Sequence, residues 1–392
     1  MQTVRAQDQA GQPRLARRRG GLPWLVVLVS LSLVAQPQRA AGDSSANDPP
    51  ADDSQYALLL GKPREVEAVL TMDLRAPQVS ATEWWLFAAR PPALACQTHP
   101  SVRLLPGGEE YVEDAPLARP LLRARLLPGQ QATKHGFSAR LEYKAQLASR
   151  RLVRREPGQK YHVPERLSAA QREQYVSANE LYDFKMPAFQ QWLRENRLLR
   201  SPSEGDTDFA RRVFLVLKPK LRYEYHETMD RSATSVARTR VSDCGGMSLL
   251  LASVLRAGGV PARVIAGRWA VSSKPGAMVG DVKYAQQHVK AEFYARGVGW
   301  VPVDMSSAVL HDPAPEGLRY FGSDRGNFFV IHVDPLLHVS DGHGFKQTYT
   351  WLQGFHYHYH GKGSLADSTD EKSWRVTWSD SAAAGKHGGL SP

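Results

Sequence analysis

Cysteine is scarce in this chain of 392 residues, in which Cys96 and Cys244 are the only two. A single bridge is too few for a disulfide scaffold in a chain of this length. If Cys244 is a nucleophile it must stay a free thiol, and Cys96 then has no partner. We therefore expect two unpaired cysteines, with one structural disulfide as the alternative.

The sequence near the amino terminus lacks an apolar run of membrane-spanning length. The run from Leu22 to Ala35 has 14 residues, whereas a spanning helix needs about 20. Arginines 17–19 precede this run, and the small residues Ala40 and Ala41 follow it. This pattern predicts a cleaved signal peptide over residues 1–42 and a periplasmic or secreted protein, with an uncleaved membrane anchor as the alternative.

Features typical of nucleic-acid binding are also missing. The formal net charge is +11, but residues 1–42 hold six arginines and one aspartate, which leaves about +6 for the remainder. The basic cluster Arg150, Arg151, Arg154 and Arg155 has no interleaved aromatic residues and no nucleic-acid motif. We expect a solvated strand face there and no nucleic-acid partner, with association to cell-envelope polyanions as the alternative.

Composition and periodicity divide the rest of the chain. Residues 43–56 are rich in Asp, Ser, Asn and Pro and predict a linker. Alternation over 137–147, with similar segments between 66 and 127, predicts a small all-β domain over residues 57–158. Residues 165–378 mix helical and strand patterns, and residues 379–392 predict a disordered tail.

One helix carries a cysteine in its first turn. Apolar residues at helical spacing follow Cys244, Ser242 or Asp243 can cap the start, and Gly258 begins the stop signal. Free N–H groups and the helix dipole favour a thiolate at such a position. A thiol placed to ionise needs a base.

A hairpin after this helix supplies the base and a carboxylate. The segments 289–295 and 300–304 predict antiparallel strands, and pairing Phe293 with Gly299 sets His288 opposite Asp304. Opposed residues have Cβ atoms about 4.5–5.5 Å apart, which suits an imidazole–carboxylate hydrogen bond. Cys244, His288 and Asp304 are thus the predicted nucleophile, base and orienting group.

Three segments carry a family resemblance: 244–267, the run from His288 through Glu292, and Gly299-Trp-Val-Pro-Val-Asp304. They resemble the transglutaminase-like superfamily over roughly residues 180–340. The resemblance implies an α+β fold, with a papain-like core in which the cysteine helix packs on an antiparallel sheet. It also implies acyl transfer through a thioester by Cys244, His288 and Asp304, without a cofactor.

This chain departs from the common family pattern at three positions. Ser242 replaces a frequent Gly, Lys290 a frequent Trp, and Met305 a frequent Pro. The family also places an aromatic oxyanion donor before the cysteine, and Tyr223 and Tyr225 both remain candidates. These departures leave the triad intact but change the expected fit of the substrate.

A separate candidate site is the alternating triplet His356, His358 and His360. Three imidazoles on one strand face can bind Zn²⁺ or Cu²⁺. No carboxylate or cysteine is adjacent in sequence, so we predict an aromatic edge strand and no bound metal.

The functional hypothesis is an exported thiol enzyme that acts on an amide of a protein or peptide. Hydrolysis is favoured over cross-linking, because water is abundant outside the cell and no lysine acceptor site is identified. The alternative is a non-catalytic cell-envelope scaffold or binding module with the same fold.

Overall fold

The structure is a computed structural model that describes residues 53–379 except residue 281. The predicted signal peptide lies outside the described residues, as does the predicted tail apart from Ser379. The predicted linker is described only from Asp53, which is buried and accepts a hydrogen bond from the backbone N–H of Thr207 (3.2 Å). The end of that segment is therefore packed into the fold. Among the described residues, no helix has the length and apolarity needed to cross a membrane.

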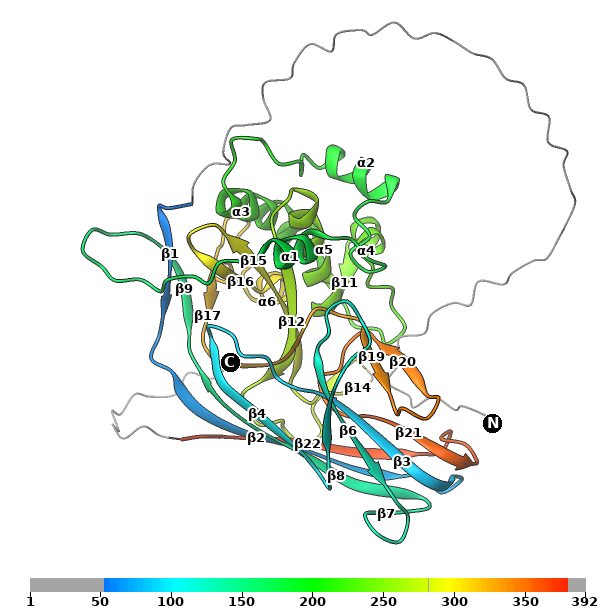
Figure 1. Ribbon diagram of the computed structural model, residues 1–392. Coiled ribbons are helices and arrows are strands. Elements are labelled where there is room, and N and C mark those ends of the chain that lie inside the picture. Colours follow the sequence, from blue (N-terminus) through cyan, green and yellow to red (C-terminus); the bar gives the residue numbers. More distant parts are fainter. Residues whose placement is uncertain (1–52, 281, 380–392) are drawn as a thin grey trace, which may run out of the picture.

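Two antiparallel sheets form a β-sandwich (Figure 1). The strands of the first sheet are β2 (Arg64–Arg75), β4 (Gln97–Leu105), β7 (Ala132–Thr133), β8 (Gly136–Leu147) and β22 (Thr369–Trp378). Those of the second are β3 (Ser80–Ala89), β5 (Glu109–Val112), β6 (Pro120–Leu126) and β21 (His356–Lys362). Their orders are β22-β2-β8-β4, with β7 paired to β8, and β21-β3-β6-β5. Burial alternates along β2 and β8, as the sequence pattern predicted.

The two carboxyl-terminal strands complete this sandwich. Strand β21 pairs with β3, and β22 pairs with β2 along its whole length. Trp374 of β22 is fully buried and packs edge-on against Tyr143, with ring centroids 5.8 Å apart. The predicted boundaries place these strands in the 165–378 domain, whereas their pairing places them with residues 57–158. Alternation shows which face of a strand is buried but not which strand is its partner.

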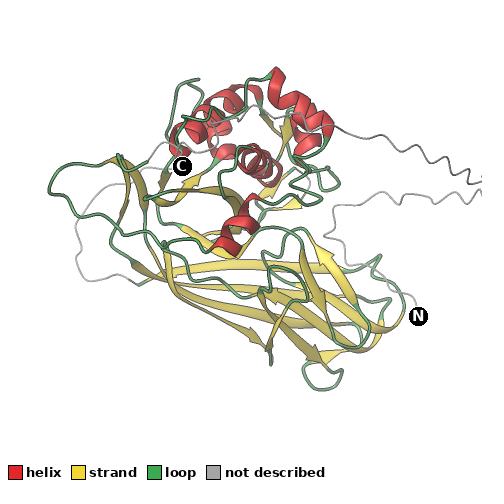
Figure 2. Cartoon of the chain, turned by 45° about the horizontal axis from the view of Figure 1, so that its top comes forward, coloured by secondary structure: helices red, strands yellow, loops and turns green. Residues whose placement is uncertain are grey.

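A second half combines helices with a four-stranded sheet (Figure 2). The sheet order is β16-β15-β12-β18, in strands β12 (Ala262–Trp269), β15 (Gln287–Ala295), β16 (Gly299–Val303) and β18 (Phe328–Val333). The helices are α1 (Ala169–Val176), α2 (Pro187–Glu195), α3 (Asp206–Leu217), α4 (Ala233–Thr239), α5 (Cys244–Ala257) and α6 (Met305–His311), with the 3₁₀ turn η2 (Lys218–Lys220).

Short strands connect these layers. They are β1 (Tyr56–Leu60), β9 (Arg150–Arg154) and β17 (Ser323–Asp324) in one sheet, and the pairs β10 (Arg222–Tyr223) with β11 (Val241–Ser242), β13 (Met278–Val279) with β14 (Val282–Lys283), and β19 (Leu337–Ser340) with β20 (Lys346–Tyr349). The whole is the predicted α+β class, with mixed helix and sheet.

Strands β12 and β15 are buried on both faces. One face joins the core cluster that contains the apolar residues of α5. The other carries polar side chains, including Lys290 and Glu292, that pair with buried partners. Their sequence alternation therefore separates an apolar face from a buried polar face, not from solvent.

Candidate active site

Cys244 is the first residue of α5, which spans the predicted residues 244–257. Asp243 caps the helix, because its Oδ1 accepts from the N–H of Gly246 (3.1 Å). Its Oδ2 accepts from Nε of buried Arg231 (2.9 Å). The same carboxylate thus holds the helix start in place and forms an ion pair beside the thiol.

The helix is attached to β15 next to His288. Ser248 Oγ donates to the carbonyl of Val289 (3.2 Å). Cys244 lies four residues before Ser248 and therefore on the same helix face, one turn closer to the start. The cysteine side chain thus faces the strand that carries His288.

His288 and Asp304 are in direct contact: His288 Nε2 and Asp304 Oδ2 are 2.9 Å apart. The predicted hairpin register was wrong by two residues, because Phe293 pairs with Val301 and Ala295 with Gly299. A two-residue shift keeps every side chain on its face. His288 and Asp304 are consequently diagonal neighbours on the two strands and not directly opposed residues, and the predicted pair still forms.

Asp304 follows β16 directly and caps α6. Its Oδ1 accepts from the N–H of Ser307 (3.0 Å) and from Ser306 Oγ (3.3 Å), which leaves Oδ2 for the imidazole. Burial opposes ionisation of this carboxyl, but His288 and Lys290 together with the Ser307 N–H hold its pKa well below the ordinary value. A charged Asp304 accepts a hydrogen bond from His288 Nε2–H, so Nδ1 is the nitrogen available to take the thiol proton.

Aromatic rings fix the plane of the imidazole. Trp269 at the end of β12 stacks on His288 at 4.8 Å with an interplanar angle of 25°. Phe328 meets the ring edge-on at 6.0 Å. The carbonyl of His288 accepts from Gln353 Nε2 (2.7 Å). Sequence reasoning missed Trp269, although the pairing of Gly267 with His288 brings the end of β12 to this place.

The predicted low pKa of the thiol is not what the structure produces. Desolvation raises the pKa of Cys244, and the Asp243 carboxylate raises it further. The Val289 backbone N–H and Arg231 act in the opposite direction without outweighing them. The substrate-free thiol is therefore neutral near pH 7 and requires a base to become a nucleophile.

Tyr223 lies beside the start of the cysteine helix. It pairs in parallel with Ser242, two residues before Cys244. Burial raises the pKa of Tyr223, and the Cys244 and Asp243 charges add to that shift. Tyr225 lies instead 6.0 Å from the guanidinium of Arg231. Trp351 is a second aromatic residue at this place. Its ring packs over Gly245, because a Cβ added to Gly245 would lie 2.9 Å from the ring.

A buried ion-pair network lies on the polar face of β15. Glu292 is fully buried and accepts from Arg263 Nε (2.7 Å) and from Arg150 Nη1 (2.5 Å). Lys290 Nζ donates to Asp324 Oδ2 (2.9 Å) and lies 4.4 Å from the Trp269 ring centroid. The expectation of a solvated face therefore fails for Arg150, which is 3% exposed.

Both cysteines are free, as predicted. Cys96 is buried, and burial raises its pKa to about 11. It is thus a structural thiol, while Cys244 keeps some solvent exposure.

Residues 196–305 match a family model described as transglutaminase-like superfamily. The match contains Cys244, His288 and Asp304, and it confirms the resemblance found in the sequence motifs. No curated protein sequence matches the chain.

Two solved structures illustrate the structural similarity. A candidate cysteine protease from Cytophaga hutchinsonii shares 11% identity with a TM-score of 0.49, covering 83% of this chain and 94% of that chain. The periplasmic domain of TgpA from Pseudomonas aeruginosa, bound to ethylmercury, shares 14% identity with a TM-score of 0.32, covering 69% and 81%.

Proposed function

We propose that this chain, whose residues 196–305 form a transglutaminase-like superfamily domain, is an exported thiol enzyme that cleaves a protein or peptide amide. The observation that carries the proposal is the His288–Asp304 contact at 2.9 Å, on the strand that faces the cysteine end of α5. Export is inferred from the basic and apolar pattern of residues 1–42.

The side chains suggest a two-step reaction. His288 takes the Cys244 proton at Nδ1, and the sulfur attacks the amide carbonyl. The Cys244 N–H and the Tyr223 hydroxyl are the donors available to the oxyanion. The C–N bond then breaks, the amine leaves with the proton from His288, and the acyl group stays on sulfur. Water attacks the thioester and gives the acid; an amine acceptor would instead give a cross-link.

The test is incubation of the purified protein with a defined mixture of casein peptides, read by mass spectrometry. New peptide termini or deamidated glutamine would show hydrolysis, and linked peptides would show transfer. Cys244→Ala should abolish all products while leaving the circular dichroism spectrum unchanged. Products that persist in Cys244→Ala would reject the proposal.

Asp304→Asn tests the orienting group. The amide keeps the α6 cap but cannot stabilise an imidazolium, so the rate should fall by about 10³–10⁴. A rate equal to wild type would show that the His288–Asp304 contact has no part in the reaction.

The competing function is a scaffold or binding module at the cell envelope. The buried, charged Asp304 supports the enzyme over the scaffold. Burying a carboxylate is costly, and a site without catalytic function gains nothing from holding one against His288. Thiol reactivity separates the two: in an enzyme, His288→Ala slows iodoacetamide labelling of Cys244 by about 10²-fold near pH 7. In a scaffold the labelling rate would not respond to His288.

A further inference from the structure

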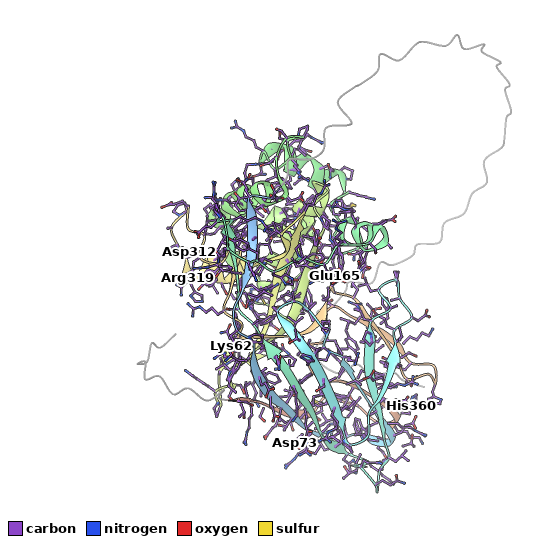
Figure 3. All side chains as sticks on the ribbon, turned by 60° about the vertical axis from the view of Figure 1, so that its left-hand side comes forward. Lys62, Asp73, Glu165, Asp312, Arg319 and His360 are labelled. Carbon is purple, nitrogen blue, oxygen red and sulfur yellow. The ribbon has the colours of Figure 1, made fainter. Side chains whose placement is uncertain are left out.

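A second cluster of ligand-type side chains lies far from the cysteine helix. Asp341, His358 and His360 place one ligand atom each within 4.8 Å of one another. His358 and His360 alternate along β21 and therefore share a face, while Asp341 follows β19. Figure 3 labels His360 in the sandwich half of the molecule.

The Nε2 atom of His358 is buried and has no hydrogen-bond partner among the described residues. The residue is 6% exposed, and its ring stacks flat on Phe345 with centroids 4.0 Å apart and an interplanar angle of 9°. A buried nitrogen without a hydrogen-bond partner is costly, and a bound ligand would satisfy it.

The other two ligand groups are already oriented. Asp341 Oδ2 lies 2.7 Å from His360 Nε2. Its Oδ1 accepts from the backbone N–H of His343 (2.7 Å) and of Phe345 (3.0 Å), which fixes the carboxylate plane. Glu83 Oε1 lies 3.6 Å from His360 Nε2 and accepts from Trp85 Nε1 (3.1 Å). A held second carboxylate is typical of the outer shell of a metal site.

We propose that Asp341, His358 and His360 bind one divalent transition metal of the Zn²⁺ class. Two imidazoles and one carboxylate are a zinc ligand set, with a fourth position left for water on the partly exposed side of His360. Ca²⁺ and Mg²⁺ prefer all-oxygen sets and fit less well. Binding at His360 Nε2 replaces its hydrogen bond to Asp341; the neutral imidazole then carries its proton on Nδ1, and no redox step is involved.

Only two histidines of the sequence triplet belong to the cluster. His356 shares the strand but stacks on Tyr349 with centroids 3.8 Å apart, outside the cluster. Asp341 takes its place because the β19–β20 hairpin folds back onto β21. The carboxylate that was absent near the histidines in sequence is therefore supplied by tertiary structure.

A metal here would close the chain between Asp341 and His358 into a loop. That loop holds Trp351 and Gln353, which contact Gly245 and the His288 carbonyl. Metal binding would therefore restrict a segment that lines the thiol site.

The experiment uses untagged full-length protein, stripped with EDTA and titrated with Zn²⁺ by calorimetry, with elemental analysis after dialysis. We expect one Zn²⁺ per chain in wild type, and a rise in the thermal midpoint on adding Zn²⁺. His358→Gln and Asp341→Asn should each weaken binding by at least about a hundredfold. His356→Gln, on the same strand but outside the cluster, should bind like wild type.

Three outcomes would overturn the proposal. They are no saturable binding to folded wild type, wild-type affinity in both ligand variants, or equal loss in His356→Gln. Co²⁺ adds a readout independent of folding energy, since a four-coordinate site gives strong visible absorption. That absorption should vanish in Asp341→Asn, which is a nearly isosteric change and covers the case in which His358→Gln does not fold.

Discussion

Cys244 illustrates how one side chain depends on its immediate neighbours. The helix start supplies N–H groups that favour a thiolate, while desolvation and Asp243 raise the pKa of the thiol. On the proposed function, this balance gives His288 the part of a base that acts during attack, and not of half a resting ion pair. Arg231 limits the effect of Asp243 by pairing with it.

The alkylation rate of Cys244 should therefore rise with pH and show a midpoint above the ordinary thiol value of about 8.5. The alkylation rate can be measured directly by labelling Cys96→Ser protein with iodoacetamide and following the product by mass spectrometry. Cys96 should contribute little even when present, because it is buried with a pKa of about 11. A midpoint well below 8.5 would instead reveal a thiolate–imidazolium pair at rest.

His332 should make stability depend on pH. It is 2% exposed, its Nε2 accepts from the N–H of Leu352 (3.1 Å), and burial, with the Arg119 charge, lowers its pKa to about 3. The unfolded histidine titrates near 6.5, so its contribution is complete above that pH and is lost as pH falls toward 3. About 2 kcal/mol should be gone by pH 5.

Urea unfolding of wild type at pH 7.5 and pH 5 measures that loss. His332→Gln should reduce the difference in the free energy of unfolding between pH 7.5 and pH 5. His338→Gln, at an exposed position, serves as the control and should leave it unchanged. An undiminished difference in His332→Gln would refute the assignment.

At the scale of elements, α5 and the β15–β16 hairpin carry the candidate triad between them. The helix starts at a capped cysteine, and Ser248 joins it to the strand. The hairpin then delivers Asp304 as the cap of α6. Each triad member therefore sits at an element end, where a backbone group or cap restricts its position.

The cap of α5 can be measured separately from its ion pair. Asp243→Asn keeps an oxygen for the Gly246 N–H but removes the charge that pairs with Arg231, whereas Asp243→Ala removes both. Urea unfolding should show both variants destabilised, by about 3–5 kcal/mol for the unpaired buried Arg231. The Ala variant should lose about 1 kcal/mol more. Equal stabilities would mean that the cap contributes nothing.

At the scale of the whole molecule, the two halves are tied by chain crossing and by charge. Residues 356–378 return to the sandwich after the chain has formed the triad half. Arg150 of β9 pairs with Glu292 of β15, both almost completely buried. The halves are therefore expected to unfold together, because separation would break the Arg150–Glu292 pair and leave a group that stays buried without its partner.

A fragment of residues 57–158 should consequently fail to fold. It lacks β21 and β22, and so lacks Trp374, whose indole is fully buried. Circular dichroism and amide proton dispersion should show an unfolded chain. Joining residues 355–379 to the fragment through a flexible linker should restore a folded sandwich. A fragment that folds without these strands would contradict the interleaved topology.

Local patterns alone determined much of this protein. The span of α5, the existence of the hairpin, the His288–Asp304 pair and the free cysteines were all accessible from sequence, because helix periodicity, strand alternation and turn residues act over a few positions. The His288–Asp304 contact survived a register error because a shift of two preserves the strand face.

Only tertiary structure decided what depends on distant partners. It placed β21 and β22 in the sandwich, buried Arg150 against Glu292, paired Tyr223 with Ser242 near Cys244, and brought Asp341 to His358 and His360. It also raised the pKa of the Cys244 thiol, since desolvation is set by everything that packs around a group. Such effects arise between residues far apart in the chain, and no local pattern encodes them.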